Sequence, residues 1–228
     1  MPGFNRCTIQ TDRTIATAAV WRPHVILDLR DVGHADWGID MKSGRMNVVR
    51  VIDGHDAEHV ALTDLDKAVT YGDLRVRVAQ IRHGLDARGI GVGGVVGVSA
   101  GNETDFVAAS LAALALGAVV MPLNPTSPVP EMQRKVNAGH PDLLLVGELG
   151  HALLDHADEF EIPLIDLATF AREMDIHPDV RTAPVDAVDR HLDDSAFYMA
   201  TSGVSGAPKV AVLSHHNLDW VQEALEQT

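Results

Sequence analysis

One stretch of the chain combines the residue types that bind a phosphate group. Residues 198–210 read YMATSGVSGAPKV. A phosphate loop needs backbone N–H groups that face the anion, glycines that let the main chain approach closely, and a cation. Gly203 and Gly206 permit that path, Lys209 can reach a phosphate as a point charge, and the hydroxyl donors are Thr201, Ser202 and Ser205. We therefore predict a phosphate-binding loop, with an ordinary glycine turn between strands as the alternative.

The stretch does not fit the Walker A loop, whose pattern is G-x-x-x-x-G-K-[ST]. Counted from Gly203, the second glycine of that pattern falls on Pro208 and its final hydroxyl falls on Val210. A Walker loop also opens a helix, whereas residues 209–213 (KVAVL) have the pattern of a strand. The sequence thus excludes kinase and GTPase mechanisms that are built on that loop.

The elements that must position the loop alternate between strand and helix from residue 70 onward. Thr70 and Asp73 predict a capped helix start, Gly89 predicts the end of that helix, and Asn102 predicts the cap of the next one. Strands are expected at residues 95–100, 118–123, 143–146, 162–167, 196–200 and 209–213, and the later helices at 102–116, 128–138 and 151–157. Such alternation predicts an α/β domain with a largely parallel sheet and flanking helices.

Residues 1–45 lack a clean period, so we predict an N-terminal extension that adds little to the fold, followed by one domain at residues 46–228. A cluster of acidic residues and a histidine in the extension has no recognisable metal-coordination spacing. Adjacent His215 and His216 point in different directions and make a poor chelate. No metal site is therefore predicted.

The net charge and the cysteine count of the chain indicate which kinds of partner and location to expect. The net charge of −14 repels nucleic-acid backbones, although a local pocket can still bind ATP. The single cysteine, Cys7, excludes an internal disulfide and favours a cytoplasmic location. The first thirty residues lack the pattern of a signal peptide, and the apolar run at residues 106–123 is interrupted by Ser110 and Gly117. We therefore expect no membrane span and no nucleic-acid partner.

The order [TS]-S-G-x-[ST]-G-x-P-K, between two strands, resembles the signature of the adenylate-forming (AMP-binding) enzymes. This superfamily includes acyl-CoA synthetases, aryl-CoA ligases, luciferases and the adenylation domains of peptide synthetases. Residues 212–218 (VLSHHNL) are similar to the family's continuation of this loop. Upstream, residues 70–74 (TYGDL) and 117–125 (GAVVMPLNP) resemble two further family motifs. The resemblance covers about residues 46–228 and occurs in family order.

The resemblance implies a fold and a reaction. The chain would be the first part of the large N-terminal domain of an acyl-CoA synthetase. In this family the loop holds the β- and γ-phosphates of ATP while a carboxylate attacks the α-phosphorus. Mg²⁺ is the second implied cofactor, and the family binds it with a later acidic loop. An acyl-adenylate and pyrophosphate form, and a thiol such as coenzyme A takes the acyl group. The implied nucleotide-binding residues are Thr201, Ser202, Gly203, Val204, Ser205, Gly206 and Lys209.

Two further assignments follow from the same resemblance. His215 would lie on the side of the acyl pocket, and the P-L-N-P turn favours a fatty-acid substrate. Val204 and Val210 depart from the family pattern. Val204 replaces a hydroxyl donor, a loss worth about 1.5–3 kcal/mol at a charged group.

The family's later motifs are not found in these residues, so no catalytic residue is assigned. These motifs are an acidic Y-G-x-T-E-like loop, a ribose-binding aspartate, a hinge and a C-terminal lysine. We expect the chain alone not to turn over, and we expect uncovered apolar surface that favours association. The alternatives are one half of a split enzyme completed in trans by a complementary C-terminal polypeptide, a non-catalytic nucleotide-binding or interaction module, and a gene remnant.

Overall fold

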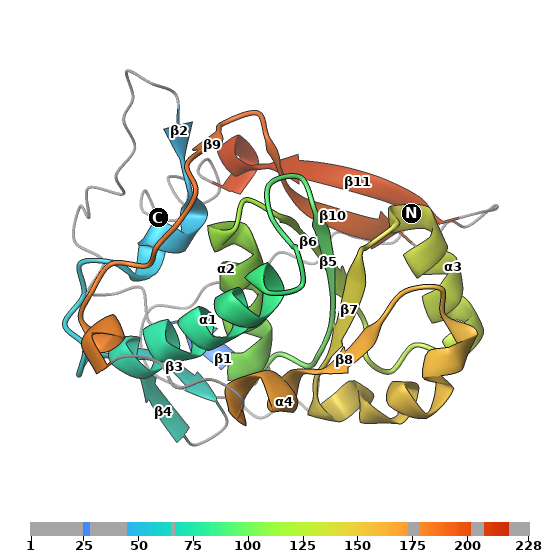
Figure 1. The fold of residues 1–228 in the computed structure, drawn as a ribbon, viewed down its shortest axis with the longest axis horizontal. Coiled ribbons are helices and arrows are strands. Elements are labelled where there is room, and N and C mark those ends of the chain that lie inside the picture. Colours follow the sequence, from blue (N-terminus) through green and yellow to red (C-terminus); the bar gives the residue numbers. More distant parts are fainter. Residues whose placement is uncertain (1–24, 28–44, 65–66, 173–177, 202–207, 219–228) are drawn as a thin grey trace, which may run out of the picture.

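The computed structural model describes residues 25–27, 45–64, 67–172, 178–201 and 208–218. Its main element is a six-stranded sheet with the strand order β11-β10-β6-β5-β7-β8 (Figure 1). Adjacent strands are parallel from β10 to β8, and β11 is antiparallel to β10. The strands are β5 (Val95–Ser99), β6 (Val119–Leu123), β7 (Leu143–Val146), β8 (Leu164–Asp166), β10 (Ser195–Thr201) and β11 (Lys209–Ser214). The predicted α/β class and largely parallel sheet are thus confirmed.

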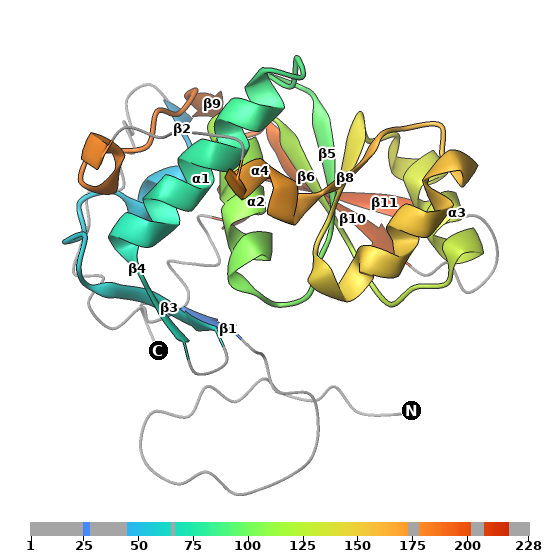
Figure 2. The same cartoon turned by 60° about the horizontal axis from the view of Figure 1, so that its bottom comes forward.

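Helices cover both faces of this sheet (Figures 1 and 2). On one face lie α1 (Tyr71–Asp86), α2 (Thr104–Ala115) and α4 (Leu167–Arg172), and on the other lie α3 (Val129–Gly139) and the 3-10 helix η2 (Glu148–Glu159). Successive side chains of β7 point to opposite faces of the sheet. Leu143 and Leu145 belong to the core under α1 and α2, whereas Leu144 and Val146 belong to the core under α3 and η2. Burial on both faces explains why β7 has a continuous apolar sequence.

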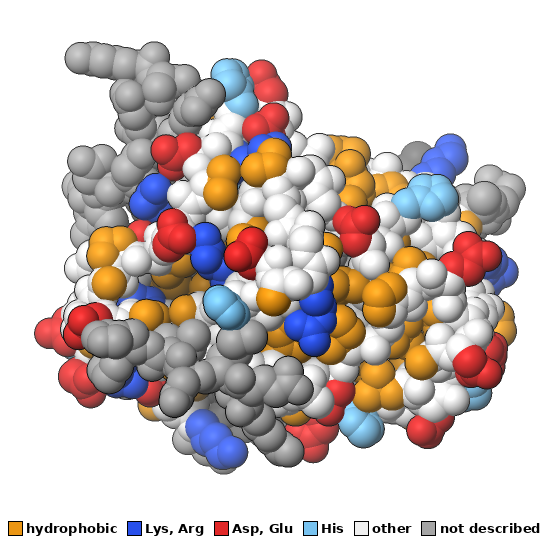
Figure 3. Space-filling view, viewed as in Figure 1, with side chains coloured by type: hydrophobic (Ala, Val, Ile, Leu, Met, Phe, Trp, Pro, Cys, Tyr) orange, Lys and Arg blue, Asp and Glu red, His pale blue; other side chains and the backbone are white. Residues whose placement is uncertain are grey.

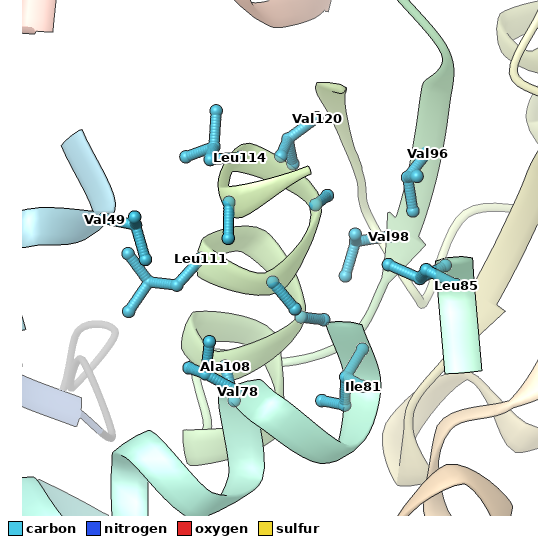
Figure 4. Close-up of a cluster of buried hydrophobic side chains, with 14 of the residues drawn as sticks. Val49, Val78, Ile81, Leu85, Val96, Val98, Ala108, Leu111, Leu114 and Val120 are labelled. Atoms are coloured by element: carbon cyan, nitrogen blue, oxygen red, sulfur yellow. The ribbon is translucent and has the colours of Figure 1, made fainter. Parts of the chain in front are cut away.

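The larger core lies between α1, α2 and the sheet (Figure 4). Val78 and Ile81 of α1 pack with Leu111 of α2 against the strand residues Val96 and Val98. Most of the α2 side chains in this core are alanines, so α2 can lie close to both α1 and the sheet. A similar close approach occurs at α4, where a Cβ added to α1 at Gly84 would overlap the ring of Phe170.

The helix ends agree with the sequence prediction in part. Thr70 caps α1, because its Oγ1 accepts a hydrogen bond from the backbone N–H of Asp73 at 3.1 Å. The cap of α2 differs from the prediction, since Glu103 rather than Asn102 occupies that position. The predicted helix at 151–157 is part of the 3-10 helix η2.

Two small sheets flank the domain. In the first, β1 (Val25–Leu27) and β4 (Lys67–Thr70) both pair antiparallel with β3 (Val60–Asp64). In the second, β2 (Arg45–Met46) pairs with β9 (Arg190–His191). Because β1 lies within the predicted N-terminal extension, residues 25–27 contribute an edge strand to the fold. The rest of that extension, residues 1–24 and 28–44, lies outside the described residues.

A segment that we name the strap, residues 178–191, crosses the outer side of α1 and α2. It begins with the 3-10 helix η3 (Pro178–Arg181) and ends with β9. The side chain of Asn47, which also caps the 3-10 helix η1 (Val48–Ile52), joins the strap to α2. Its Nδ2 donates to the carbonyl oxygens of Leu114 and Val188, at 2.6 and 2.8 Å. The strap then leads directly into β10.

Apolar surface remains at the β10–β11 edge, where Met199 and Val212 are 40% and 55% exposed. On the face drawn in Figure 3, acidic and basic side chains of the described residues are interspersed and form no broad basic patch. None of the described helices is long and apolar enough to cross a membrane.

Candidate functional site

The strands β5, β6, β7 and β10 all end at one edge of the sheet, because they run parallel. The loop after β5 leads to α2 on one face, whereas the loops after β6 and β7 lead to α3 and η2 on the other face. The chain therefore diverges at this carboxyl edge. Such a divergence leaves a crevice outside the strand ends, which is where open α/β sheets bind their ligands.

A cavity of about 560 Å³ occupies that crevice. Its walls come from the segment after β5, the end of β6 with the turn that follows it, one residue of α2 and one residue of η2. None of the described residues that line it carries a charge. They are Ala100, Gly101, Asn102, Phe106, Pro122, Leu123, Asn124, Pro125, Thr126 and Leu149. The cavity thus suits the uncharged part of a ligand rather than a bare phosphate.

The turn after β6 is fixed by its own side chains. Asn124 Oδ1 accepts hydrogen bonds from the backbone N–H of Thr126 at 3.0 Å and from the Thr126 hydroxyl at 2.9 Å. An asparagine often closes a turn in this way. The P-L-N-P turn is therefore a rigid wall of the cavity.

Ser99, at the end of β5, lies next to the same cavity. It is fully buried, and its hydroxyl has no hydrogen-bond partner among the described residues. A Cβ added to Gly150 would lie 3.3 Å from Ser99 Oγ and 3.2 Å from the Cβ of the lining residue Pro125. A buried hydroxyl without a partner is uncommon, so Ser99 could donate to a bound water or ligand. Ser99 could not be predicted as a site residue from the sequence, since a lone serine at a strand end matches no motif.

The predicted phosphate loop connects β10 to β11 at this edge. Thr201 ends β10 and is paired with Lys209, the first residue of β11, and the Thr201 hydroxyl donates to the Lys209 carbonyl oxygen at 3.1 Å. Between them, Ser202, Gly203, Val204, Ser205 and Gly206 lie outside the described residues. The structure therefore brings together the two ends of the predicted loop and leaves its central residues undescribed.

The loop ends lie at the level of the cavity. Phe197 of β10 is in parallel register with Val120 of β6. Continuing this register by four residues brings Thr201 level with Asn124 of the P-L-N-P turn. Lys209 is exposed, and no carboxylate in the described part of the chain forms an ion pair with it. Its ammonium group is thus available to an anion at the edge that carries the cavity.

His215 lies at the other end of β11, one residue beyond Ser214. It is fully buried, and neither ring nitrogen has a hydrogen-bond partner among the described residues. Burial lowers the pKa of His215 to about 4, and the Arg190 guanidinium contributes in the same direction. The imidazole is therefore neutral at neutral pH. The structure does not bring His215 together with the cavity or with the ends of the phosphate loop.

The neighbours of His215 have a structural role. Asn217 Oδ1 accepts hydrogen bonds from the backbone N–H of Ser214 at 3.0 Å and from its hydroxyl at 3.1 Å. The Asn217 backbone N–H donates back to Ser214 Oγ at 3.3 Å. This reciprocal pair closes the turn from β11 into the following helix. The serine and asparagine of the S-H-H-N motif can thus be explained by local capping.

Metal ligands do not converge in this part of the protein. Across the ranges that the structure describes, no three histidine, cysteine, aspartate or glutamate side chains are grouped so that they could hold a metal ion.

Comparisons with known proteins agree with this geometry. The family model described as AMP-binding enzyme matches residues 50–227. A putative 4-coumarate–CoA ligase-like protein of Oryza sativa subsp. japonica is 32% identical over 163 residues, which are 70% of this chain and 26% of that protein. The L-proline–[L-prolyl-carrier protein] ligase of Pseudomonas fluorescens is 31% identical over 172 residues, which are 72% of this chain and 34% of that protein. The chain thus spans about a quarter to a third of these two relatives.

The fold is also similar to that of solved structures. The structure of o-succinylbenzoate CoA synthetase from Bacillus subtilis, in complex with an acyl-adenylate intermediate, superposes with a TM-score of 0.57 at 21% identity. The superposition covers 71% of this chain and 40% of that one. At this identity the likeness concerns the fold alone.

Proposed function

Because the chain belongs to the AMP-binding enzyme family, we propose that it contributes the phosphate-binding part of an enzyme that activates a carboxylic acid with ATP. The product would be an acyl-adenylate, from which a thiol such as coenzyme A takes the acyl group. One observation carries this proposal. Thr201 and Lys209, the two ends of the glycine-rich loop, are paired at the carboxyl edge beside the uncharged cavity.

The loop would act by position and charge. Lys209 would neutralise the β- and γ-phosphates of ATP, which leave as pyrophosphate when the carboxylate attacks the α-phosphorus. Backbone N–H groups and hydroxyls of residues 201–206 would donate to the same oxygens. Groups that are already oriented toward developing charge lower the barrier without a reorganisation cost. Mg²⁺ would arrive with the nucleotide phosphates, and the described residues offer it no ligand set of their own.

The cavity would accept the arm of the thiol acceptor. That arm is uncharged in coenzyme A and combines methylene groups with amides. The cavity offers matching groups, since Phe106, Pro122 and Leu149 are apolar while Asn102 and Thr126 can form hydrogen bonds. We further propose a fatty-type acid as the substrate, which rests on the family resemblance of the P-L-N-P turn.

A calorimetric ATP titration with Mg²⁺ tests the proposal. Replacing Lys209 by alanine removes one charge-assisted contact, so we expect ATP affinity to fall about tenfold to a hundredfold. Arg134→Ala is the matched control, because Arg134 is an exposed cation on α3. It should change affinity less than twofold. Identical titration curves for the wild-type protein and Lys209→Ala would remove the loop from nucleotide binding.

A further inference from the structure

A second cavity lies away from the carboxyl edge, between α1 and the strap. Its volume is about 240 Å³, and it shares no lining residue with the cavity at the carboxyl edge. We name it the strap groove. Its apolar lining is formed by Ala79, Val180, Ala183, Pro184 and Val185. Its polar lining is formed by Arg75, Arg82, His83 and Asp186. Two guanidinium groups thus face one small, partly apolar space.

Arg75 is buried, and its guanidinium forms no ion pair within the part of the chain that the structure describes. Only 2% of the residue is exposed, and its four hydrogen bonds all reach carbonyl oxygens. The acceptors are Ile52, His55 and Arg181, at distances of 2.6 to 3.0 Å. A guanidinium has five N–H donors, so one donor on Nη1 is left without a partner among the described residues. These carbonyls orient the group. The carboxylates of Asp53 and Asp56 act on its charge from a distance, and neither forms an ion pair with it among the described residues.

Arg82 is a second arginine in the groove whose guanidinium is only partly hydrogen-bonded. Its Nη2 donates to Asp186 Oδ2 at 2.6 Å, while its buried Nε has no hydrogen-bond partner in the described part of the chain. The Asp186 side chain is 85% exposed, whereas that of Arg82 is 22% exposed. An ion pair with such an exposed carboxylate contributes little to stability. Asp186 can therefore move into water and leave Arg82 to another anion.

We propose that the strap groove binds a small organic carboxylate with an apolar body. The carboxylate would accept from Arg82 Nε and from the free Nη1 donor of Arg75, and the apolar body would lie against Ala79 and the strap residues. A carboxylate meets a guanidinium in the planar geometry that both groups prefer. Asp186 competes with the bound carboxylate for Arg82. The carboxylate therefore binds when the Asp186 side chain is displaced from Arg82.

Benzoate is the probe, because it joins a carboxylate to an apolar ring, and benzamide is its uncharged counterpart. We expect saturable benzoate binding by the full chain in titrations followed by amide chemical shifts, with a Kd near 1 mM or below and shifts confined to α1 and the strap. Arg82→Gln should weaken benzoate binding about tenfold. Asp186→Asn should tighten it severalfold, because it removes the competitor. Arg134→Gln, far from the groove on α3, should change the Kd less than twofold.

The opposite signs expected for Arg82→Gln and Asp186→Asn separate binding from damage to the fold. Loss of the ion pair alone would affect both variants in the same direction. Should Arg82→Gln not fold, Ala79→Leu fills the groove instead and should abolish the shifts. The proposal is overturned if wild-type protein shows no saturable shifts with benzoate, if benzamide binds equally well, or if Asp186→Asn weakens binding. Inorganic phosphate binding more tightly than benzoate would overturn the assignment of an organic carboxylate.

Discussion

Replacing Asn47 by alanine should destabilise the domain more than its small size suggests. Asn47 is 1% exposed, and its side chain makes three hydrogen bonds to elements far apart in the sequence. Its Nδ2 donates to the carbonyl oxygens of Leu114 and Val188, and its Oδ1 accepts from the backbone N–H of Val49 at 3.1 Å. The side chain thus joins η1, the end of α2 and the strap.

The magnitude follows from these three bonds. A buried hydrogen bond contributes about 1 kcal/mol net, and the loss of a helix cap costs about 1 kcal/mol. The Leu114 carbonyl oxygen still accepts a hydrogen bond from the backbone N–H of Gly117 at 2.9 Å. Losing the hydrogen bond from Asn47 to Leu114 should therefore cost the least of the three. We therefore expect Asn47→Ala to lower the free energy of unfolding by about 2–4 kcal/mol. Asn47→Asp should cost more, since it turns a buried carboxylate toward two carbonyl oxygens.

Urea unfolding followed by circular dichroism measures this effect. With an m-value of about 2–3 kcal/mol/M for a chain of this size, the midpoint should fall by about 1 M. Asn137→Ala, at an exposed site on α3, should leave the midpoint within about 0.2 M, since such surface changes alter stability little. A midpoint for Asn47→Ala that equals that of Asn137→Ala would show that the side chain of Asn47 does not hold the strap.

Two further predictions concern buried positions. The pKa of His215 is lowered from 6.5 to about 4 in the folded protein, so the unfolded chain binds more protons below pH 6.5 and stability must fall as the pH decreases toward 4. The full loss of unfolding free energy is about 3 kcal/mol. His215→Leu should therefore flatten the pH dependence of the urea midpoint between pH 7 and 4.5. Equal pH dependence of the midpoint in the wild-type protein and His215→Leu would contradict the lowered pKa of His215. Gly84→Ala should lower stability by about 1–3 kcal/mol in urea unfolding, because the new Cβ would overlap the Phe170 ring. Phe170→Leu in the same chain should recover part of the Gly84→Ala loss, and a stabilising effect of Gly84→Ala alone would refute the contact.

Elements with strong local signals could be predicted from the sequence. The strand at residues 143–146 has the predicted bounds, because four consecutive apolar residues can lie only between two covered faces. The helix from Tyr71 to Asp86 begins at its predicted cap, where Thr70 and Asp73 interact directly. The strand and the helix start both depend on residues that are neighbours in the sequence. Such local patterns can be read from a single sequence.

Features that depend on distant contacts could not be predicted. The strap has no helix or strand period in its sequence. The hydrogen bonds that fix it come from Asn47 and Arg75, more than a hundred residues upstream. The cavity at the carboxyl edge likewise combines the segment after β5, the end of β6 and its turn, Phe106 and Leu149. Asn124 was noted as part of a motif, but Ser99 and Gly150 became visible only when these strand ends met.

The pairing of Thr201 with Lys209 makes the predicted phosphate loop the tip of a hairpin. In a Walker loop a helix follows at once, so a change in loop length must turn or shift that helix. Here the ladder from Ser195–Ser214 to Thr201–Lys209 fixes both strands behind the tip. Residues 202–208 can therefore vary in composition, or even in number, while the sheet stays unchanged. Residues that would contact the ligand are thus separate from the residues that form the ladder. Ligand affinity can therefore evolve separately from folding.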